Sequence, residues 1–343
     1  MSRAQPTLLL PGILGPDQHV LMASGGGGTF KAAQRLVEQV GAEQLTLLFC
    51  DTLIEHRDCY KLLAHTAFRT FERAGSNSAH HILSMVDALP EYHEDPAGRV
   101  QQLNAIRQAM ALAVPQLVWL ADGRDPWTLF FERKFLGNSR VDLCSKELKR
   151  DIADRWLRAN RDPAITTVYL GMDWTEEHRF IEAKSRYART GYRCEAPLCG
   201  APLLPALWKA DLYQELLALG IDVELYRLGF PHNNCGGFCI KAGQAFFALL
   251  LRTKPLVYAF HEAKEQAIRG VLGDVSILKD RRGGVTRTLT LEQFRLRIDA
   301  GGAYDKNDFG SCGCMGGDDD EPTRDAPLDL VYRDGLVQPQ LVR

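Results

Sequence analysis

The sequence has no long hydrophobic run. Its longest uninterrupted apolar segment is Ala245–Leu251, which is far shorter than the roughly 18 residues that a membrane-spanning helix needs. Near the N-terminus, Pro11 and Gly12 interrupt the apolar cluster Leu8–Leu10, so we expect no secretory signal. These absences predict a cytoplasmic protein that has no membrane partner.

The sequence also lacks an excess of charge of either sign. Its 41 Lys and Arg residues nearly balance 43 Asp and Glu residues, giving a formal net charge of -2, which excludes a strongly basic nucleic-acid coat protein. Among 343 residues, 45% are hydrophobic and 24% are charged. This composition is typical of a folded globular chain with one large domain or two ordinary ones.

What the sequence does contain is an alternation of short apolar runs with segments of helical periodicity. Strands are expected at Val20–Ala23, Leu45–Cys50, Thr166–Leu170 and Val223–Leu228, with His81–Met85 as a further candidate and Leu117–Leu120 as either strand or helix. Helices are expected at Thr29–Val40, Tyr60–Glu72, Arg99–Val114, Ser145–Ala159, Leu212–Leu219 and Lys241–Arg252. This order predicts an α/β fold with a parallel, Rossmann-like sheet and crossover helices.

A glycine-rich loop lies between the first predicted strand and the first predicted helix. It reads Ser24-Gly25-Gly26-Gly27-Gly28-Thr29. Without Cβ atoms the backbone can turn its N–H groups inward, and the following helix adds its positive end, so the loop suits a phosphate. It is neither a Walker A loop nor the spaced glycine motif of dinucleotide-binding folds. The alternative interpretation is a flexible surface turn.

The chain has nine cysteines, and in the absence of a secretory signal we expect no disulfide framework. Cys235 and Cys239 have three residues between them, two of which are glycines. Cys312 and Cys314 flank a third glycine, and Cys144 is a fifth candidate. Thiols at such spacings can bind one metal centre. Three interpretations stay open at this point, namely an iron–sulfur cluster, a four-cysteine zinc site and free thiols.

Two motifs resemble the nucleotide site of a known superfamily. Ser24-Gly25-Gly26-x-x-Thr29 after a first strand resembles the PP-loop of the adenine nucleotide α-hydrolases, also called N-type ATP pyrophosphatases. Asp51-Thr52 at the end of the second strand, followed by Glu55, is similar to the Asp-Thr element of that superfamily.

Two further motifs resemble the phosphoadenosine phosphosulfate (PAPS) reductase-like branch of this superfamily. Cys144-Ser-Lys-Glu-Leu-Lys149 is similar to its Cys-x-x-x-Leu-Lys stretch, and Gly171-Met-Asp-Trp-Thr-Glu176-Glu-His-Arg179 is similar to its Gly-x-Arg-x-x-Glu-Ser-x-x-Arg. The resemblance covers roughly residues 18–260. The chain departs from the pattern at Gly28, where an acidic residue is usual, and at Asp173, where an arginine is usual.

The resemblance implies a HUP-type parallel sheet and a set of site residues. Those implied to bind ATP or a sulfonucleotide, with Mg²⁺, are Ser24, Gly25, Gly26, Gly27, Gly28, Thr29, Asp51, Thr52, Gly171, Glu176 and Arg179. Those implied to hold a [4Fe–4S] cluster, with zinc as the alternative, are Cys144, Cys235, Cys239 and Cys312. Lys149 and Cys314 are the implied catalytic residues, although which of Cys312 and Cys314 is the ligand stays open.

The expected function is ATP-dependent adenylation of an acceptor followed by sulfur transfer. The alternatives are a sulfonucleotide reductase that releases sulfite, and a non-catalytic protein that senses a nucleotide or a metal. Besides the adenine nucleotide, a sulfur or electron donor protein is an expected partner. Lys279–Arg297 carries six basic and two acidic residues, which indicates a tRNA or DNA acceptor or, alternatively, only a solvated basic face.

The expected organisation has three parts. Residues 1–230 form the nucleotide-binding α/β domain, and residues 231–317 form a cysteine-bearing C-terminal extension. Residues 318–343 form a weakly ordered acidic tail, because the chain is rich in glycine and aspartate from Gly310 onward.

Overall fold

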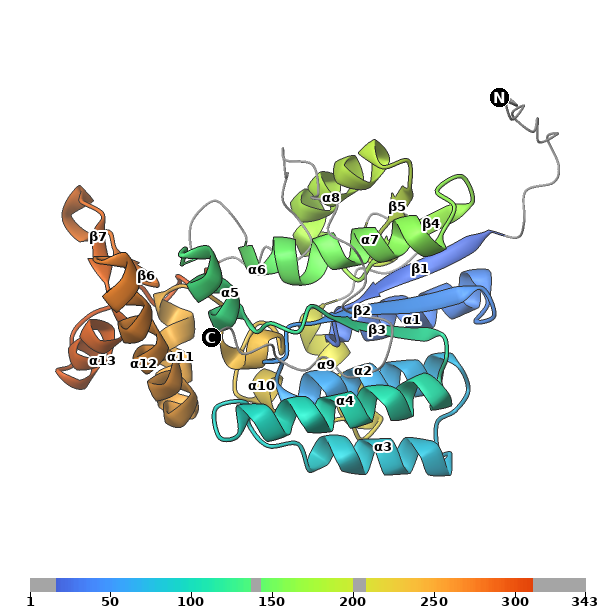
Figure 1. Cartoon of the computed structure of the whole chain (residues 1–343), viewed down its shortest axis with the longest axis horizontal. Coiled ribbons are helices and arrows are strands. Elements are labelled where there is room, and N and C mark those ends of the chain that lie inside the picture. Colours follow the sequence, from blue (N-terminus) through green and yellow to red (C-terminus); the bar gives the residue numbers. More distant parts are fainter. Residues whose placement is uncertain (1–16, 137–142, 200–207, 311–343) are drawn as a thin grey trace, which may run out of the picture.

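A computed structural model describes residues 17–136, 143–199 and 208–310, and its centre is a five-stranded parallel sheet (Figure 1). The strands are β1 (Gln18–Ala23), β2 (Leu45–Asp51), β3 (Leu117–Ala121), β4 (Thr166–Leu170) and β5 (Arg193–Glu195). Their order across the sheet is β3-β2-β1-β4-β5, and every pairing is parallel. The predicted α/β fold with a Rossmann-like, HUP-type sheet is therefore confirmed.

The strands are apolar because both faces of the sheet are covered. Every residue of β2 and of β4 is buried, as expected for a parallel sheet between two helix layers. Successive residues of β1 alternate between these layers: Leu21 and Ala23 pack in one hydrophobic cluster, whereas Val20 and Met22 pack in the other.

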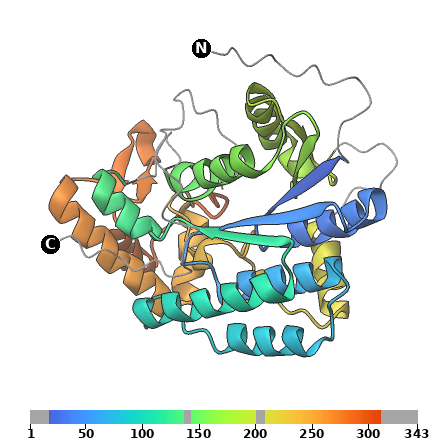
Figure 2. The same ribbon diagram turned by 45° about the vertical axis from the view of Figure 1, so that its right-hand side comes forward.

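Helices form the two layers. One face is covered by α1 (Gly27–Val40), α2 (Arg57–Thr70) and α4 (Pro96–Ala113), with α3 (Asn77–Asp87) packed outside α2 and α4. The other face is covered by α7 (Asp151–Asn160) and α8 (Glu177–Arg189), as Figure 1 and Figure 2 show. The helix that contains α7 begins earlier, at α6 (Leu143–Ser145), and runs through a π-helical turn at Lys146–Arg150. Such turns are rare and frequently occur at functional sites.

The chain after β5 is mainly helical. Its elements are α9 (Lys209–Ala218), α10 (Glu224–Arg227), α11 (Gln244–Thr253), α12 (Pro255–Leu272), the hairpin strands β6 (Leu278–Asp280) and β7 (Arg287–Leu289), and α13 (Leu291–Asp299). Helices α11–α13 and the hairpin form a unit at one end of the sheet (Figure 1). Their apolar core includes Trp127 and Phe130 of α5 (Pro126–Arg133), so this unit packs around a helix from the first half of the chain.

Two strand predictions are wrong. His81–Met85 lies inside helix α3, because Ser76 caps that helix by accepting the N–H of Ala79, and Ile82 and Val86 share its buried face. Val223–Leu228 contains the short helix α10 instead of a strand, because the carboxylate of Asp58 accepts the Glu224 N–H at 2.6 Å and turns the chain there.

Three further predictions can be compared with the described residues. Leu117–Leu120 belongs to a strand, β3, and is not a helix continuation. None of the helices in the described ranges combines the length and the apolar composition needed to cross a membrane. The predicted tail, residues 318–343, lies outside the described residues.

Candidate functional site

A pocket of about 500 Å³ opens at the carboxyl ends of β1 and β4. Its lining includes Ser24 and residues 26–29 of the glycine loop, together with Gly171, Glu176 and Arg179 from the segment after β4. Between these two strands the order of the sheet reverses, and open α/β sheets bind ligands in the crevice at such a switch point. The volume is also within the usual range for small-molecule sites. Most of the residues implied to bind the nucleotide are thus brought together at one pocket.

The glycine loop has a fixed shape. Gly25 has a φ of 68°, and a Cβ atom there would lie 2.5 Å from the Sγ atom of Cys59 and 2.6 Å from its carbonyl oxygen, so only glycine fits. The hydroxyls of Ser24 and Thr29 lie 2.9 Å apart, and the Ser24 N–H donates to Thr29 Oγ1 at 3.0 Å. The side chains at the two ends of the loop therefore tie it together.

The first turn of α1 presents amide groups to the pocket. The Gly27 N–H donates to the hydroxyl of Tyr226 at 3.0 Å. Among the described residues, the amides of Gly28 and Thr29 have no hydrogen-bond acceptor, and the first turn of α1 carries no acidic side chain. Unpaired N–H groups at a helix N-terminus, together with the helix dipole, favour an anion at this place.

The segment after β4 contributes a cation and a capped turn. Arg179 forms an ion pair with Glu176, and its Nε atom is buried with no hydrogen-bond partner among the described residues. Asp173, which replaces the arginine of the resembled motif, is buried and accepts the Thr175 N–H at 2.8 Å. Asp173 therefore fixes the turn that carries Glu176 and Arg179 into the pocket.

Asp51 and Thr52 lie at the end of β2, but they do not line this pocket. The carboxylate of Asp51 accepts hydrogen bonds from the Leu53 amide and the Tyr60 hydroxyl, both at 2.8 Å, and from the Trp119 indole at 3.1 Å. Burial raises the pKa of Asp51 and outweighs the lowering effect of these three bonds. Both implied nucleotide residues thus belong to a buried polar network behind the glycine loop.

Glu55 is the centre of that network, and the sequence assigned it no role of its own. Its side chain is fully buried. The Oε1 atom accepts a hydrogen bond from Thr52 Oγ1 at 3.0 Å and lies 3.1 Å from the ammonium of Lys149. The Oε2 atom accepts the N–H of Cys235. The guanidinium of Arg99 donates a hydrogen bond to the backbone carbonyl oxygen of Glu55 at 2.6 Å. The sequence signal that could have identified Glu55 is its position four residues after Asp51, next to the Asp51-Thr52 motif.

The loop that carries Cys235 is fastened to the glycine loop. Asn233 Nδ2 donates to the Gly25 carbonyl at 2.9 Å, and Asn234 Nδ2 donates to the Ser24 carbonyl at 2.5 Å. The hydroxyl of Tyr226, which holds the Gly27 amide, also donates to Asn233 Oδ1 at 3.2 Å. A conformational change in the glycine loop would therefore be transmitted to the cysteine-bearing loop through these hydrogen bonds.

The predicted thiol ligands are only partly within the described residues. Cys239 belongs to the apolar cluster around Phe238, and Cys144, at the start of the π-helical segment, packs against the same cluster. Through Lys149 and Glu55, that segment meets the backbone of Cys235. Cys312 and Cys314 lie outside the described residues.

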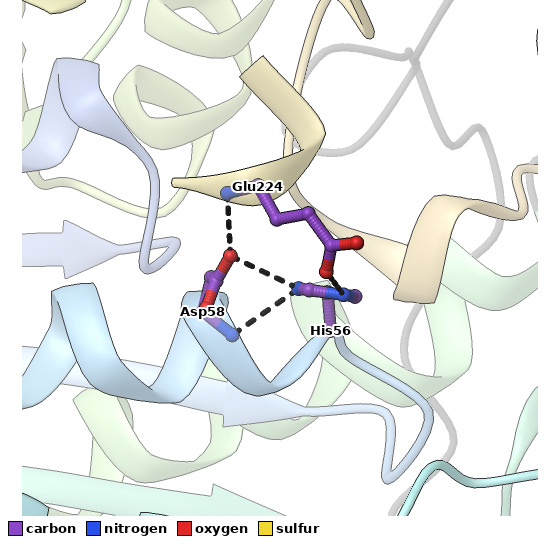
Figure 3. A group of neighbouring side chains, drawn as sticks. All are labelled: His56, Asp58 and Glu224. Carbon is purple, nitrogen blue, oxygen red and sulfur yellow. Dashed lines mark hydrogen bonds and ion pairs between the residues drawn. The ribbon is translucent and has the colours of Figure 1, made fainter. Parts of the chain in front are cut away.

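A separate cluster of His56, Asp58 and Glu224 has the composition of a metal site (Figure 3). It already contains a cation, since the ammonium of Lys254 lies 3.2 Å from His56 Nε2 and 3.4 Å from the Glu224 carboxylate. Although burial opposes a charged imidazole, hydrogen bonds to Asp58 and Glu224 raise the pKa of His56. The bond from His56 lowers the pKa of Glu224 to about 2. We interpret this cluster as an internal ion network that joins α2, α10 and α12.

Comparison of the chain with protein-family models, curated proteins and solved structures finds no match.

Proposed function

We propose that the pocket binds an adenine nucleotide and that the protein uses ATP to activate an acceptor for sulfur transfer. The observation that carries the proposal is the meeting of two loops, Ser24–Thr29 and Gly171–Arg179, at one pocket where the strand order reverses. Each loop by itself is compatible with a surface turn. Their convergence at the switch point of a parallel sheet is typical of a nucleotide site.

The phosphate end of this site is the N-terminus of α1. The amides of Gly28 and Thr29 offer two donors, and Arg179 has a buried Nε–H with no partner among the described residues. A phosphate placed between them would gain charge-assisted hydrogen bonds from both sides. The carboxylates of Glu176 and Asp173 border the same pocket, where Mg²⁺ that accompanies the phosphates would find oxygen ligands.

The proposed reaction has two steps. The acceptor oxygen first forms a bond with the α-phosphorus, and the bond to the bridging oxygen breaks with release of pyrophosphate. A sulfur nucleophile then attacks the acceptor carbon, and the carbon–oxygen bond breaks with AMP as the leaving group. Adenylation makes a poor leaving group into a good one, and a thiolate is a strong nucleophile.

Support for sulfur chemistry comes from the connection between the nucleotide loop and the cysteine segments. Asn233 and Asn234 bind the glycine loop, and Glu55 joins Lys149 to the Cys235 amide. A [4Fe–4S] cluster needs four thiolates. Cys144, Cys235 and Cys239 would supply three, and Cys312 or Cys314 the fourth, with zinc as the alternative. A bound cluster would supply sulfur or electrons, whereas Lys149 would place a buried positive charge beside it.

Binding of ATP tests the nucleotide proposal. A Gly26→Asp substitution adds a carboxylate next to the Ser24 hydroxyl and Asn233 Oδ1, where it would repel phosphate, so calorimetry should detect no ATP binding by the folded variant. Gly26→Asn, which has the same size without the charge, is the matched control and should keep part of the affinity. Wild-type affinity in the aspartate variant would contradict the proposal.

Product analysis separates the proposed reaction from its closest rival. Incubation with ATP should release pyrophosphate, whereas a reductase would instead release sulfite from a sulfonucleotide. We favour ATP because Asp173 supplies no positive charge where the resembled reductase motif has an arginine. Anaerobic purification followed by a visible spectrum and metal analysis would distinguish an iron–sulfur cluster from zinc and from free thiols.

A further inference from the structure

Three exposed aromatic side chains belong to, or directly adjoin in the chain, the residues that line the pocket. Trp174, Trp208 and Phe309 expose 38%, 56% and 41% of their surface. Phe309 lines the pocket, and each tryptophan is the chain neighbour of a lining residue, Asp173 for Trp174 and Lys209 for Trp208. Exposed apolar patches beside a pocket mark interaction sites more often than scattered apolar residues do. Aromatic surface is therefore exposed on the segments that line the pocket.

The two tryptophans form a pair. Their ring centroids are 4.9 Å apart and their planes are inclined by 83°, so the edge of one ring meets the face of the other. One tryptophan comes from the turn after β4, and the other directly precedes α9. Two segments that are distant in sequence thus form one aromatic platform, Trp174 with Trp208. Local chain geometry alone does not explain why these two rings are in contact.

We propose that Trp174 and Trp208 bind a nucleobase of the acceptor by stacking. Aromatic side chains stack on any base, and nearby cations hold the phosphates attached to it. Lys209 supplies such a cation, because it is exposed, lines the pocket and has no ion pair among the described residues. The inference rests on the proposed function: if ATP occupies the glycine-loop end of the pocket, the segments that carry the two tryptophans border the place where the acceptor meets the α-phosphorus.

Tryptophan fluorescence tests the stacking. Three of the five tryptophans, Trp119, Trp127 and Trp156, are buried, so quenching by a ligand in solution reports on the exposed pair. We expect quenching by a short single-stranded oligonucleotide and by nucleoside monophosphates. Tighter binding of the oligonucleotide would indicate a base within a strand, whereas equal binding would indicate a free nucleotide; absence of quenching by both would overturn the proposal.

Variants of the two tryptophans test whether the platform is responsible for oligonucleotide binding. Trp208→Leu and Trp174→Leu should each weaken the binding of a labelled oligonucleotide, followed by anisotropy, by about tenfold or more. Trp208→Phe keeps an aromatic ring and should retain part of the affinity. This variant distinguishes the loss of stacking from a loss of folding. Phe135→Leu is the matched control, since Phe135 is exposed and neither it nor its chain neighbours line the pocket.

ATP affinity, measured by calorimetry on the same variants, separates the two proposals. We expect it to be unchanged by Trp208→Leu. If this variant weakens ATP as strongly as the oligonucleotide, the platform holds the adenine of ATP and the inference is wrong. If the wild-type chain binds bases but not ATP, the stacking platform stands and the proposed nucleotide function fails.

Discussion

Gly28 and Gly171 are in backbone contact, and neither position has room for a side chain. A Cβ atom on Gly28 would overlap the carbonyl oxygen of Gly171, and a Cβ atom on Gly171 would lie 2.7 Å from the Thr29 amide nitrogen. The end of β4 therefore lies directly against the first turn of α1. A side chain at position 28 would therefore not fit against the end of β4.

The first prediction concerns this contact. Gly28→Ala should push α1 and β4 apart and lower the free energy of unfolding by about 1–3 kcal/mol, with a loss of ATP affinity. The control is Gly270→Ala in helix α12, where an added Cβ meets nothing within 4 Å. It should stabilise the protein by about 0.5–1 kcal/mol, because alanine is the better helix former. Urea unfolding measures both; equal effects of the same sign would contradict the packing argument.

The sequence was most informative where periodicity and chain order decide the structure. Apolar runs such as Leu45–Cys50 alternate along the chain with segments of helical periodicity, and this alternation predicts the α/β fold and the position of the glycine loop. The helix at His81–Met85 is not evident from the sequence because a short apolar run has no clear period, although Ser76 caps the helix in the structure. Short runs of this kind do not distinguish a strand from a buried helix turn.

The polar networks of the site depend on contacts between distant segments and could not be predicted. Glu55 meets Lys149 and Cys235 across 94 and 180 residues of sequence. Tyr226 meets the Gly27 amide across 199 residues. A local motif identifies residue types that can bind a ligand, but it does not show which side chain fills which hydrogen-bonding position.

The second prediction concerns the buried Glu55–Lys149 pair. Lys149→Met should destabilise the protein by about 3 kcal/mol, because it leaves an uncompensated charge on a fully buried carboxylate. Adding Glu55→Gln should recover much of this loss, since the double variant buries no net charge. Unfolding curves of the three proteins measure the effect. If the double variant is less stable than Lys149→Met, the carboxylate is held by its other hydrogen bonds and not by Lys149.

The third prediction is a pH dependence that originates in Glu265. This side chain is buried beneath the β6–β7 hairpin, and its oxygens accept the amides of Ile277 at 2.7 Å and Leu291 at 2.6 Å. Burial raises the pKa of Glu265 from 4.5 to about 7. Between these values the folded protein keeps a proton that the unfolded chain has lost. Stability should therefore fall as the pH rises through this window, by up to about 1.4 kcal/mol per pH unit.

Substitution isolates the Glu265 contribution. Glu265→Gln does not titrate, so its unfolding free energy should vary less with pH between 4.5 and 7 than that of the wild type. Its stability at the low end should also decrease somewhat, because an amide nitrogen cannot accept a backbone N–H. Glu292→Gln, which alters an exposed carboxylate on α13, should leave the slope unchanged. Parallel slopes in all three proteins would assign the pH dependence to other groups.

The last prediction concerns the basic segment Lys279–Arg297 and a nucleic-acid acceptor. Its charges are not equivalent: Asp280 pairs with both Arg282 and Arg297, at 2.6 and 2.8 Å, and Glu262 pairs with Arg295. Arg281 and Arg287 at the hairpin are exposed and have no ion pair among the described residues. Together with Lys279, which is partly exposed and also has no ion pair among the described residues, these two side chains can contact phosphates without first breaking an ion pair.

Salt-dependent binding distinguishes these charges. The variant Arg281→Ala with Arg287→Ala should weaken binding to all sequences and reduce the slope of log affinity against log salt by about 1.4–1.8, at about 0.7–0.9 for each phosphate that is no longer neutralised. The matched control, Arg282→Ala, removes a charge that Asp280 already neutralises, so its slope should change by less than half as much. Gel shifts with total tRNA and genomic DNA at several salt concentrations measure both. If neither nucleic acid is retained even at low salt, the hairpin is a solvated basic face, and the acceptor is a small molecule.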